Sequence, residues 1–101
     1  MLPLARFRVE DDSMSPHLEP GDFVVVNRWA YRFRPPLTGD VVVVRDPEVP
    51  GRLLVKRIFQ ISPEGLVGLQ GDNTARSRDS RAFGPVGKEA VVGKVWLRLR
   101  P

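Results

Sequence analysis

The 101-residue sequence predicts an all-β fold that forms one small domain over residues 1–101. Short runs of β-branched residues, which favour strands, recur along the chain and follow turn residues. Ten prolines and the lack of a long amphipathic pattern argue against a long helix. A chain of this length can bury one modest core and is too short for two domains. We therefore expect a small barrel or sandwich.

Five stretches are the expected strands. Residues 22–28 (DFVVVNR) and 40–46 (DVVVVRD) each begin at the aspartate of a Gly-Asp turn, and their apolar runs suit strands covered on both faces. Residues 52–61 follow a Pro-Gly turn and residues 65–70 follow SPEG, so these two strands should form a hairpin. A last strand is expected over residues 90–99.

Composition excludes several classes of function. The chain has no cysteine, which rules out disulfides, thiolate metal sites and cysteine nucleophiles. A single histidine, His17, disfavours a histidine metal site or a Ser-His-Asp triad, and we interpret it as a surface residue in a turn. The net charge of +4, with thirteen arginines and three lysines, favours acidic partners, nucleic acid or an anionic membrane surface.

The sequence shows no membrane-spanning segment. No apolar stretch approaches the roughly 20 residues that a helix needs to cross a bilayer. Residues 1–12 lack a signal-peptide core, because Pro3, Arg6 and Arg8 interrupt them. We therefore expect a cytoplasmic protein without a membrane anchor, or a membrane-associated one if the chain is the trimmed part of an anchored enzyme.

Lys56 stands out within the third expected strand. Alternation along the strand places Lys56 on the same face as Leu54 and Ile58. One interpretation is a lysine at the strand edge whose amine reaches solvent. The other is that burial lowers the pKa of Lys56, which leaves a neutral amine able to activate a serine. This strand alone leaves both interpretations open.

Three ordered stretches carry a resemblance to a known family. They are SMSPHLEPGD (13–22), LLVKRI (53–58) and GDNTARSRDSRAFGPV (71–86). In this order they resemble the nucleophile box, the lysine box and the closing box of signal peptidase I, a family of serine peptidases with a Ser-Lys dyad. The resemblance runs from about Val9 to Val95. It implies a coiled, partly open β-barrel of the type shared by signal peptidases and self-cleaving repressors.

Within this superfamily the chain looks most similar to the maturation proteases of nickel-type superoxide dismutase. Those proteins are also short, and they share the DSRAFGPV ending followed by VVGKV. Only fourteen residues separate Lys56 from Gly71, which is a shorter connection than full signal peptidases usually have. The resemblance implies a serine endopeptidase that needs no cofactor or metal. Its expected partner is a precursor protein, nickel superoxide dismutase, whose N-terminal leader would enter in an extended pose.

The resemblance also assigns roles to single residues. Ser13 would be the nucleophile, and Lys56 would take its proton. Ser77 would hydrogen-bond Lys56 and orient its amine. Asp79 and Arg81 would form an ion pair that braces the site, since two residues apart on a strand share a face.

Further residues would shape the surroundings of Ser13. Met14 would line the substrate cleft or cover the dyad. Pro16 would also belong to the cleft and would help to form the turn that presents Ser13. Many family members carry a small polar residue two positions before the nucleophile, where it donates to the oxyanion. This chain has Asp11 there, and an ionised carboxylate cannot donate. The backbone N–H of Ser13 would then have to supply the contact.

The sequence leaves two alternatives to this function open. The chain could be the trimmed soluble catalytic domain of a signal peptidase I, or a non-catalytic basic β-barrel that acts as a binding module. Trp29, Tyr31 and Phe33 alternate with small or basic residues, as on a strand with one aromatic face. Aromatic rings flanked by arginine can stack on single-stranded nucleic acid. No other binding signature supports this, so we expect no nucleic-acid partner.

Overall fold

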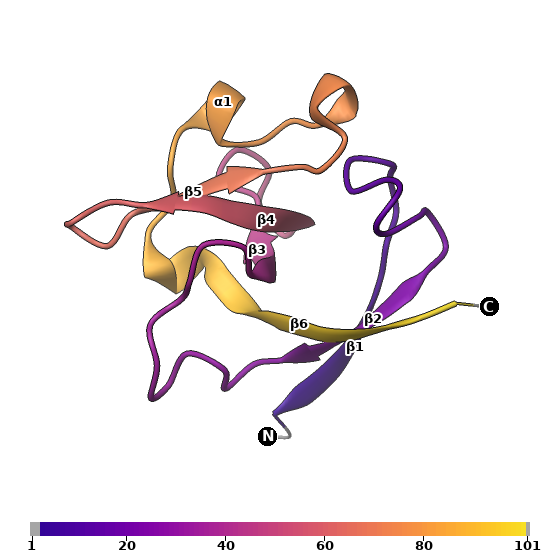
Figure 1. Cartoon of the computed structure of the whole chain (residues 1–101), viewed down its shortest axis with the longest axis horizontal. Coiled ribbons are helices and arrows are strands. Elements are labelled where there is room, and N and C mark those ends of the chain that lie inside the picture. Colours follow the sequence, from indigo (N-terminus) through magenta and orange to yellow (C-terminus); the bar gives the residue numbers. More distant parts are fainter. Residues whose placement is uncertain (1–2, 101) are drawn as a thin grey trace.

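The computed structural model describes residues 3–100 and is all-β, as predicted (Figure 1). Six antiparallel strands form one sheet in the order β1-β2-β6-β3-β4-β5. The strands are β1 (Leu4–Arg8), β2 (Phe23–Asn27), β3 (Val41–Arg45), β4 (Leu53–Ile61), β5 (Val67–Gln70) and β6 (Val91–Leu99). One short helix, α1 (Ser80–Phe83), and two 3₁₀ turns, Thr74–Arg76 and Lys88–Ala90, follow β5.

The sheet curls strongly without closing, so it forms the expected partly open barrel (Figure 1). Its two faces bury two hydrophobic clusters, and β3 contributes to both. Val41 and Val43 join one cluster, and Val42 and Val44 join the other. The prediction that residues 40–46 are covered on both faces is therefore confirmed for β3.

The same prediction for residues 22–28 is only half right. Val24 and Val26 of β2 are buried, but Phe23 and Val25 on the other face are partly exposed. The guanidinium of Arg6 stacks on the ring of Phe23, at 4.8 Å from its centre. Within residues 3–100 no second layer covers this face, so β2 behaves as an ordinary half-buried strand.

The structure confirms the hairpin of β4 and β5 and corrects two other expectations. The sequence reading missed β1, which has no β-branched residue and alternates exposed with half-buried side chains. Residues 28–34 form turns instead of a strand. The side chain of Asn27 accepts a hydrogen bond from the Trp29 N–H at 2.9 Å, which favours a turn. Trp29 and Phe33 are exposed, and the Tyr31 hydroxyl donates to Asp40 at 2.7 Å.

The curl brings together the three segments that carry the family-like motifs. Residues 9–22 follow β1, residues 53–58 lie on β4, and residues 71–79 follow β5. Within residues 3–100, no helix is long and apolar enough to cross a membrane.

Candidate active site

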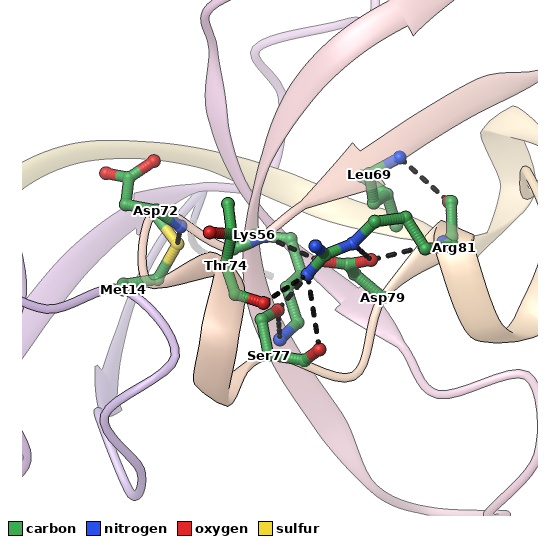
Figure 2. A network of polar contacts seen from close by, with 10 residues as sticks. Met14, Lys56, Leu69, Asp72, Thr74, Ser77, Asp79 and Arg81 are labelled. Atoms are coloured by element: carbon green, nitrogen blue, oxygen red, sulfur yellow. Dashed lines mark hydrogen bonds and ion pairs between the residues drawn. The ribbon is translucent and has the colours of Figure 1, made fainter.

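Lys56 is buried, with 2% of its surface exposed. It lies on β4 between Leu54 and Ile58, which both belong to a hydrophobic cluster. Its amine donates a hydrogen bond to the Ser77 hydroxyl at 2.9 Å (Figure 2). The interpretation as a lysine that reaches solvent is therefore wrong, because the loop after β5 covers the amine.

Desolvation lowers the pKa of Lys56 below the ordinary value for lysine. Four charged groups act on the same pKa. The carboxylates of Asp11 and Asp79 raise it, whereas the guanidinium groups of Arg78 and Arg52 lower it. Since desolvation is the largest effect, the balance favours a neutral amine more than in a free lysine.

A hydrogen-bond network continues from Lys56 to a buried carboxylate (Figure 2). The Ser77 hydroxyl accepts from Lys56 and donates to Asp79 at 2.8 Å. Asp79 also accepts from the Gly71 N–H at 2.9 Å and from Arg81 Nε at 2.9 Å. Burial by itself would raise the pKa of Asp79, but these hydrogen bonds outweigh it and hold the pKa well below its usual range. The carboxylate is therefore ionised and fixes the direction of the Ser77 hydroxyl.

Asp79 and Arg81 form an ion pair, but the predicted geometry was wrong. Asp79 is the N-cap of α1, and its Oδ1 accepts from the Arg81 N–H at 3.1 Å. The first turn of the helix brings the Arg81 side chain back over the carboxylate. Arg81 also donates to the Thr74 carbonyl at 2.8 Å, so it links the helix to the loop before it (Figure 2).

Residues 71–79, the closing loop, also hold the segment that contains Ser13. Ser13 is 3% exposed. The Asn73 N–H donates to the Ser13 carbonyl at 2.8 Å, and the Asn73 side chain donates to the Asp12 carbonyl at 3.1 Å. Gly71 makes this approach possible. A Cβ at Gly71 would lie 2.2 Å from Ser77 Oγ and 2.6 Å from the Ser13 carbonyl oxygen.

Gly71 thus lies between the Ser13 main chain and Ser77, which binds the Lys56 amine. Among the hydrogen bonds of residues 3–100, none joins the Ser13 hydroxyl directly to the Lys56 amine. The Ser13 N–H donates to the side chain of Asp11 at 3.0 Å. The sequence analysis expected this N–H to bind the oxyanion, but in the structure it is already bound to Asp11.

Met14 and Pro16 have different surroundings. Met14 is buried in the core cluster that includes Val24 and Val26, and its sulfur accepts from the Asp72 N–H at 3.4 Å (Figure 2). It also lines the cleft beside Ser13. Pro16 lies in the turn after Ser13, as expected, but it is exposed and absent from the cleft lining, so its expected place in the substrate cleft is wrong. His17 is exposed, as expected.

A cleft of about 390 Å³ opens at Ser13. It is lined by residues 6–11 and 51–55, together with Ser13 and Met14. β1 is an edge strand of the sheet, and β4 pairs with β5 only from Arg57 onward. Two strand segments without a partner on one side therefore face the cleft, which suits an extended peptide.

The sequence analysis missed one group of supporting residues. Arg78 hydrogen-bonds the buried Asp46 and also Glu48, the latter at 2.7 Å. Its guanidinium lies 5.3 Å from the centre of the Phe83 ring. Arg78 thus ties the turn between β3 and β4 to the closing loop. The sequence offered no signal for this beyond charge, since the partners are 30 and 32 residues away.

A second missed contact supports the start of the closing loop. Arg57 donates through Nε to Asp72 Oδ1 at 2.8 Å and through Nη2 to Asp72 Oδ2 at 2.9 Å. The two parallel hydrogen bonds define a bidentate pair, which fixes orientation as well as distance. Arg57 follows Lys56 on β4, so this pair sets the position of residues 71–73 against the lysine strand.

Comparisons with known proteins agree with the motifs. The family described as signal peptidase, peptidase S26, matches residues 1–65 and 59–99. A mitochondrial ATP-independent inner membrane protease subunit 1b from Arabidopsis thaliana is 35% identical over 88% of this chain, and a mitochondrial inner membrane protease subunit 2 from Danio rerio is 32% identical over 93%. Signal peptidase I from Pseudomonas aeruginosa is 33% identical over 87%.

The chain covers only part of these relatives. It spans 66% and 68% of the two mitochondrial proteins and 33% of the bacterial signal peptidase. These relatives support the family and not the narrower likeness to maturation proteases of nickel-type superoxide dismutase, which stays a prediction. The family match, the three ordered motifs and the all-β fold agree, and the chain belongs to the signal peptidase family of peptidases, S26.

Proposed function

We propose that this chain is a serine endopeptidase in which Ser13 is the nucleophile and Lys56 the general base. The observation that carries the proposal is the buried Lys56 amine, whose pKa is lowered and whose position is fixed by Ser77 beside the Ser13 segment. A desolvated lysine near a serine is a known way to activate a hydroxyl nucleophile.

The proposed reaction has two steps. Ser13 Oγ bonds to the scissile carbonyl carbon while its proton passes to the Lys56 amine, and the negative charge moves to the carbonyl oxygen. Collapse of this intermediate breaks the C–N bond, and the leaving amine takes the proton from Lys56. Water then attacks the Ser13 ester while Lys56 accepts its proton. The bond from the carbonyl carbon to Ser13 Oγ breaks, and Oγ takes that proton from Lys56, which releases the acid and restores the serine and the neutral amine. Ser77, held by the ionised Asp79, orients the lysine in both steps.

The proposed substrate is a precursor protein with an N-terminal leader. The cleft beside Ser13 has two strand edges that can pair with an extended leader segment. The likeness of residues 79–95 to the maturation proteases favours nickel superoxide dismutase as that precursor. The bacterial relative that is named a signal peptidase favours the second candidate, a secretory preprotein.

A direct comparison of these two substrates tests the proposal. The purified chain is mixed with the dismutase precursor and, separately, with a preprotein that carries a small-residue junction of the Ala-x-Ala type. We expect mass spectrometry to detect one new N-terminus in the dismutase and slow or no cleavage of the preprotein. Ser13→Ala is the control. Efficient cleavage of the preprotein alone would replace the dismutase assignment with that of a signal peptidase domain.

The pH dependence follows from the lowered pKa of Lys56. Only the neutral amine can accept the Ser13 proton, so kcat/KM is expected to rise with pH as Lys56 loses its proton. The midpoint should lie below the roughly 10.4 of a free lysine, because desolvation lowers this pKa. A pH series of kcat/KM, compared with an NMR titration of the Lys56 side chain, checks this. A midpoint at the free-lysine value would contradict the proposed base.

A further inference from the structure

The backbone N–H of Ser13 already has an acceptor. Asp11 Oδ1 lies 3.0 Å from the Ser13 nitrogen and accepts its hydrogen bond. In serine peptidases the N–H of the nucleophile is one of the donors that stabilise the oxyanion of the tetrahedral intermediate. In this chain a carboxylate oxygen therefore occupies the donor that the proposed reaction needs.

Asp11 is part of the cleft that a substrate would occupy. Asp11 is exposed, and it lines the same cleft as Ser13. Within the described residues, no salt bridge holds its carboxylate in place. The neighbouring Asp12 differs, since its carboxylate lies 3.6 Å from Arg76. The side chain of Asp11 is thus free to turn away, and such rotations of exposed side chains take picoseconds to nanoseconds.

The charge of Asp11 opposes the reaction in a second, independent way. The carboxylates of Asp11 and Asp79 both raise the pKa of Lys56, against desolvation and the charges of Arg78 and Arg52, which lower it. Asp79 is needed to orient Ser77, but Asp11 has no such role. Its negative charge also lies where the carbonyl oxygen would become negative, and like charges repel.

We propose that Asp11 is an autoinhibitory residue, whose carboxylate occupies the oxyanion donor of Ser13 until a substrate displaces it. This inference rests on the proposed function. The form of the enzyme with a free Ser13 N–H is then a minor population, and kcat/KM is reduced in proportion to that fraction. A protease regulated in this way acts slowly on exposed peptide bonds and faster on a leader that binds the cleft tightly enough to move Asp11.

Three substitutions separate the charge of Asp11 from its hydrogen bond. Asp11→Asn removes the charge but keeps an oxygen that can accept from the Ser13 N–H. Asp11→Ala frees the N–H, and Asp11→Ser replaces the carboxylate with a weaker acceptor that can also donate to the oxyanion. Glu19→Gln is the matched control, because it removes one carboxylate charge from an exposed residue of the same loop.

The measurement uses p-nitrophenyl acetate as the probe, with intact-mass detection of the acetyl group that Ser13 gains as p-nitrophenolate leaves. We expect the maximal acylation rate to rise roughly tenfold in Asp11→Ala and on the order of 100-fold in Asp11→Ser, since one oxyanion donor is typically worth about 10²–10³ in rate. Asp11→Asn removes the repulsion of the oxyanion but keeps the acceptor for the Ser13 N–H, so it should raise the maximal rate less than Asp11→Ala does. In all three variants the acylation rate should reach half its maximum at a lower pH, because the Asp11 carboxylate that raises the pKa of Lys56 is gone. Glu19→Gln should match the wild type in both the rate and this midpoint.

The possible failures are distinguishable. If the wild type acylates Ser13 but Asp11→Ala and Asp11→Ser are no faster, with unchanged thermal unfolding, Asp11 is only a turn residue and the inference is wrong. If Asp11→Ala unfolds at a lower temperature than the wild type, Asp11→Asn still tests the effect of the charge. A pH midpoint of Asp11→Asn equal to that of the wild type would contradict the claim that the Asp11 charge opposes deprotonation of Lys56. If no variant shows acylation that Ser13→Ala abolishes, the proposed function itself fails.

Discussion

Ser13→Ala is expected to reduce cleavage on the order of 10³-fold or more. The substitution removes the only atom that forms the acyl bond and leaves the backbone contact of Ser13 with Asn73 intact. Because Ser13 is small and buried, the fold should not change. Cleavage assays and circular dichroism on the same sample check both statements.

Lys56→Met should cause a loss of similar size. Methionine fills most of the space of the buried lysine stem, whereas alanine would leave a cavity beside Leu54 and Ile58. The loss can then be attributed to the missing base. The double variant should be no worse than either single variant, because the two residues act as one unit. Losses that multiply in the double variant, or full activity in either single one, would contradict a Ser13–Lys56 dyad.

The matched control for Lys56→Met is Lys94→Met. Lys94 also lies on a strand, β6, but its side chain is half-exposed and 3.6 Å from Asp40. This exposed ion pair is worth little by itself. The control should therefore retain full activity, which would show that a lost lysine charge has no general effect on cleavage.

The strands could be predicted where sequence and burial agree. Val41–Val44 are apolar without interruption and are buried on both faces, so pattern and structure match. β1 has no such run, and its place at the sheet edge depends on pairing with β2, which a local pattern does not contain. The aromatic residues 29, 31 and 33 alternate like a strand, but the Asn27 side chain stabilises a turn there instead.

The candidate site was predictable in its residues and only in part in its contacts: the resemblance implied the hydrogen bond of Lys56 with Ser77 and the ion pair of Asp79 with Arg81, and both are present. Alternation placed Lys56 between two apolar side chains, but its burial depends on the loop with Ser77, which lies 21 residues further along. The partners of Arg78 are more distant still. Asp11 could be identified as a departure from the family pattern. The hydrogen bond that Asp11 accepts from the Ser13 N–H could not be predicted. The family pattern assigns this N–H to the oxyanion, whereas an aspartate two residues earlier can bind it in a local turn.

Gly71→Ala adds a single methyl group and is expected to disrupt the site. The added Cβ would lie 2.2 Å from Ser77 Oγ, 2.5 Å from Ser77 Cβ and 2.6 Å from the Ser13 carbonyl oxygen. Gly71 is buried, and its N–H donates to Asp79 at 2.9 Å, so the loop cannot shift without losing that bond. The φ angle is not the reason, since Gly71 is not among the glycines with positive φ.

The clash must move either the Ser13 segment or Ser77. Overpacking of this kind costs about 1–3 kcal/mol, and for a domain of this size that lowers Tm by roughly 4–8 °C per kcal/mol. A displacement of about 1 Å between reacting groups can cost on the order of 100-fold in rate. We therefore expect a clear loss of thermal stability together with a loss of cleavage of at least that size.

Gly87→Ala provides the control, because it has the same closest distance but a different neighbour. Its Cβ would also meet an atom at 2.2 Å, but that atom is the carboxylate end of the exposed Glu89 side chain, which can rotate away. Differential scanning calorimetry and cleavage assays on both variants test the argument. Gly87→Ala should resemble the wild type in both. A Gly71→Ala variant that melts and cleaves like Gly87→Ala would show that Ser13 and Ser77 are not held together through residue 71, and the site would then need another arrangement.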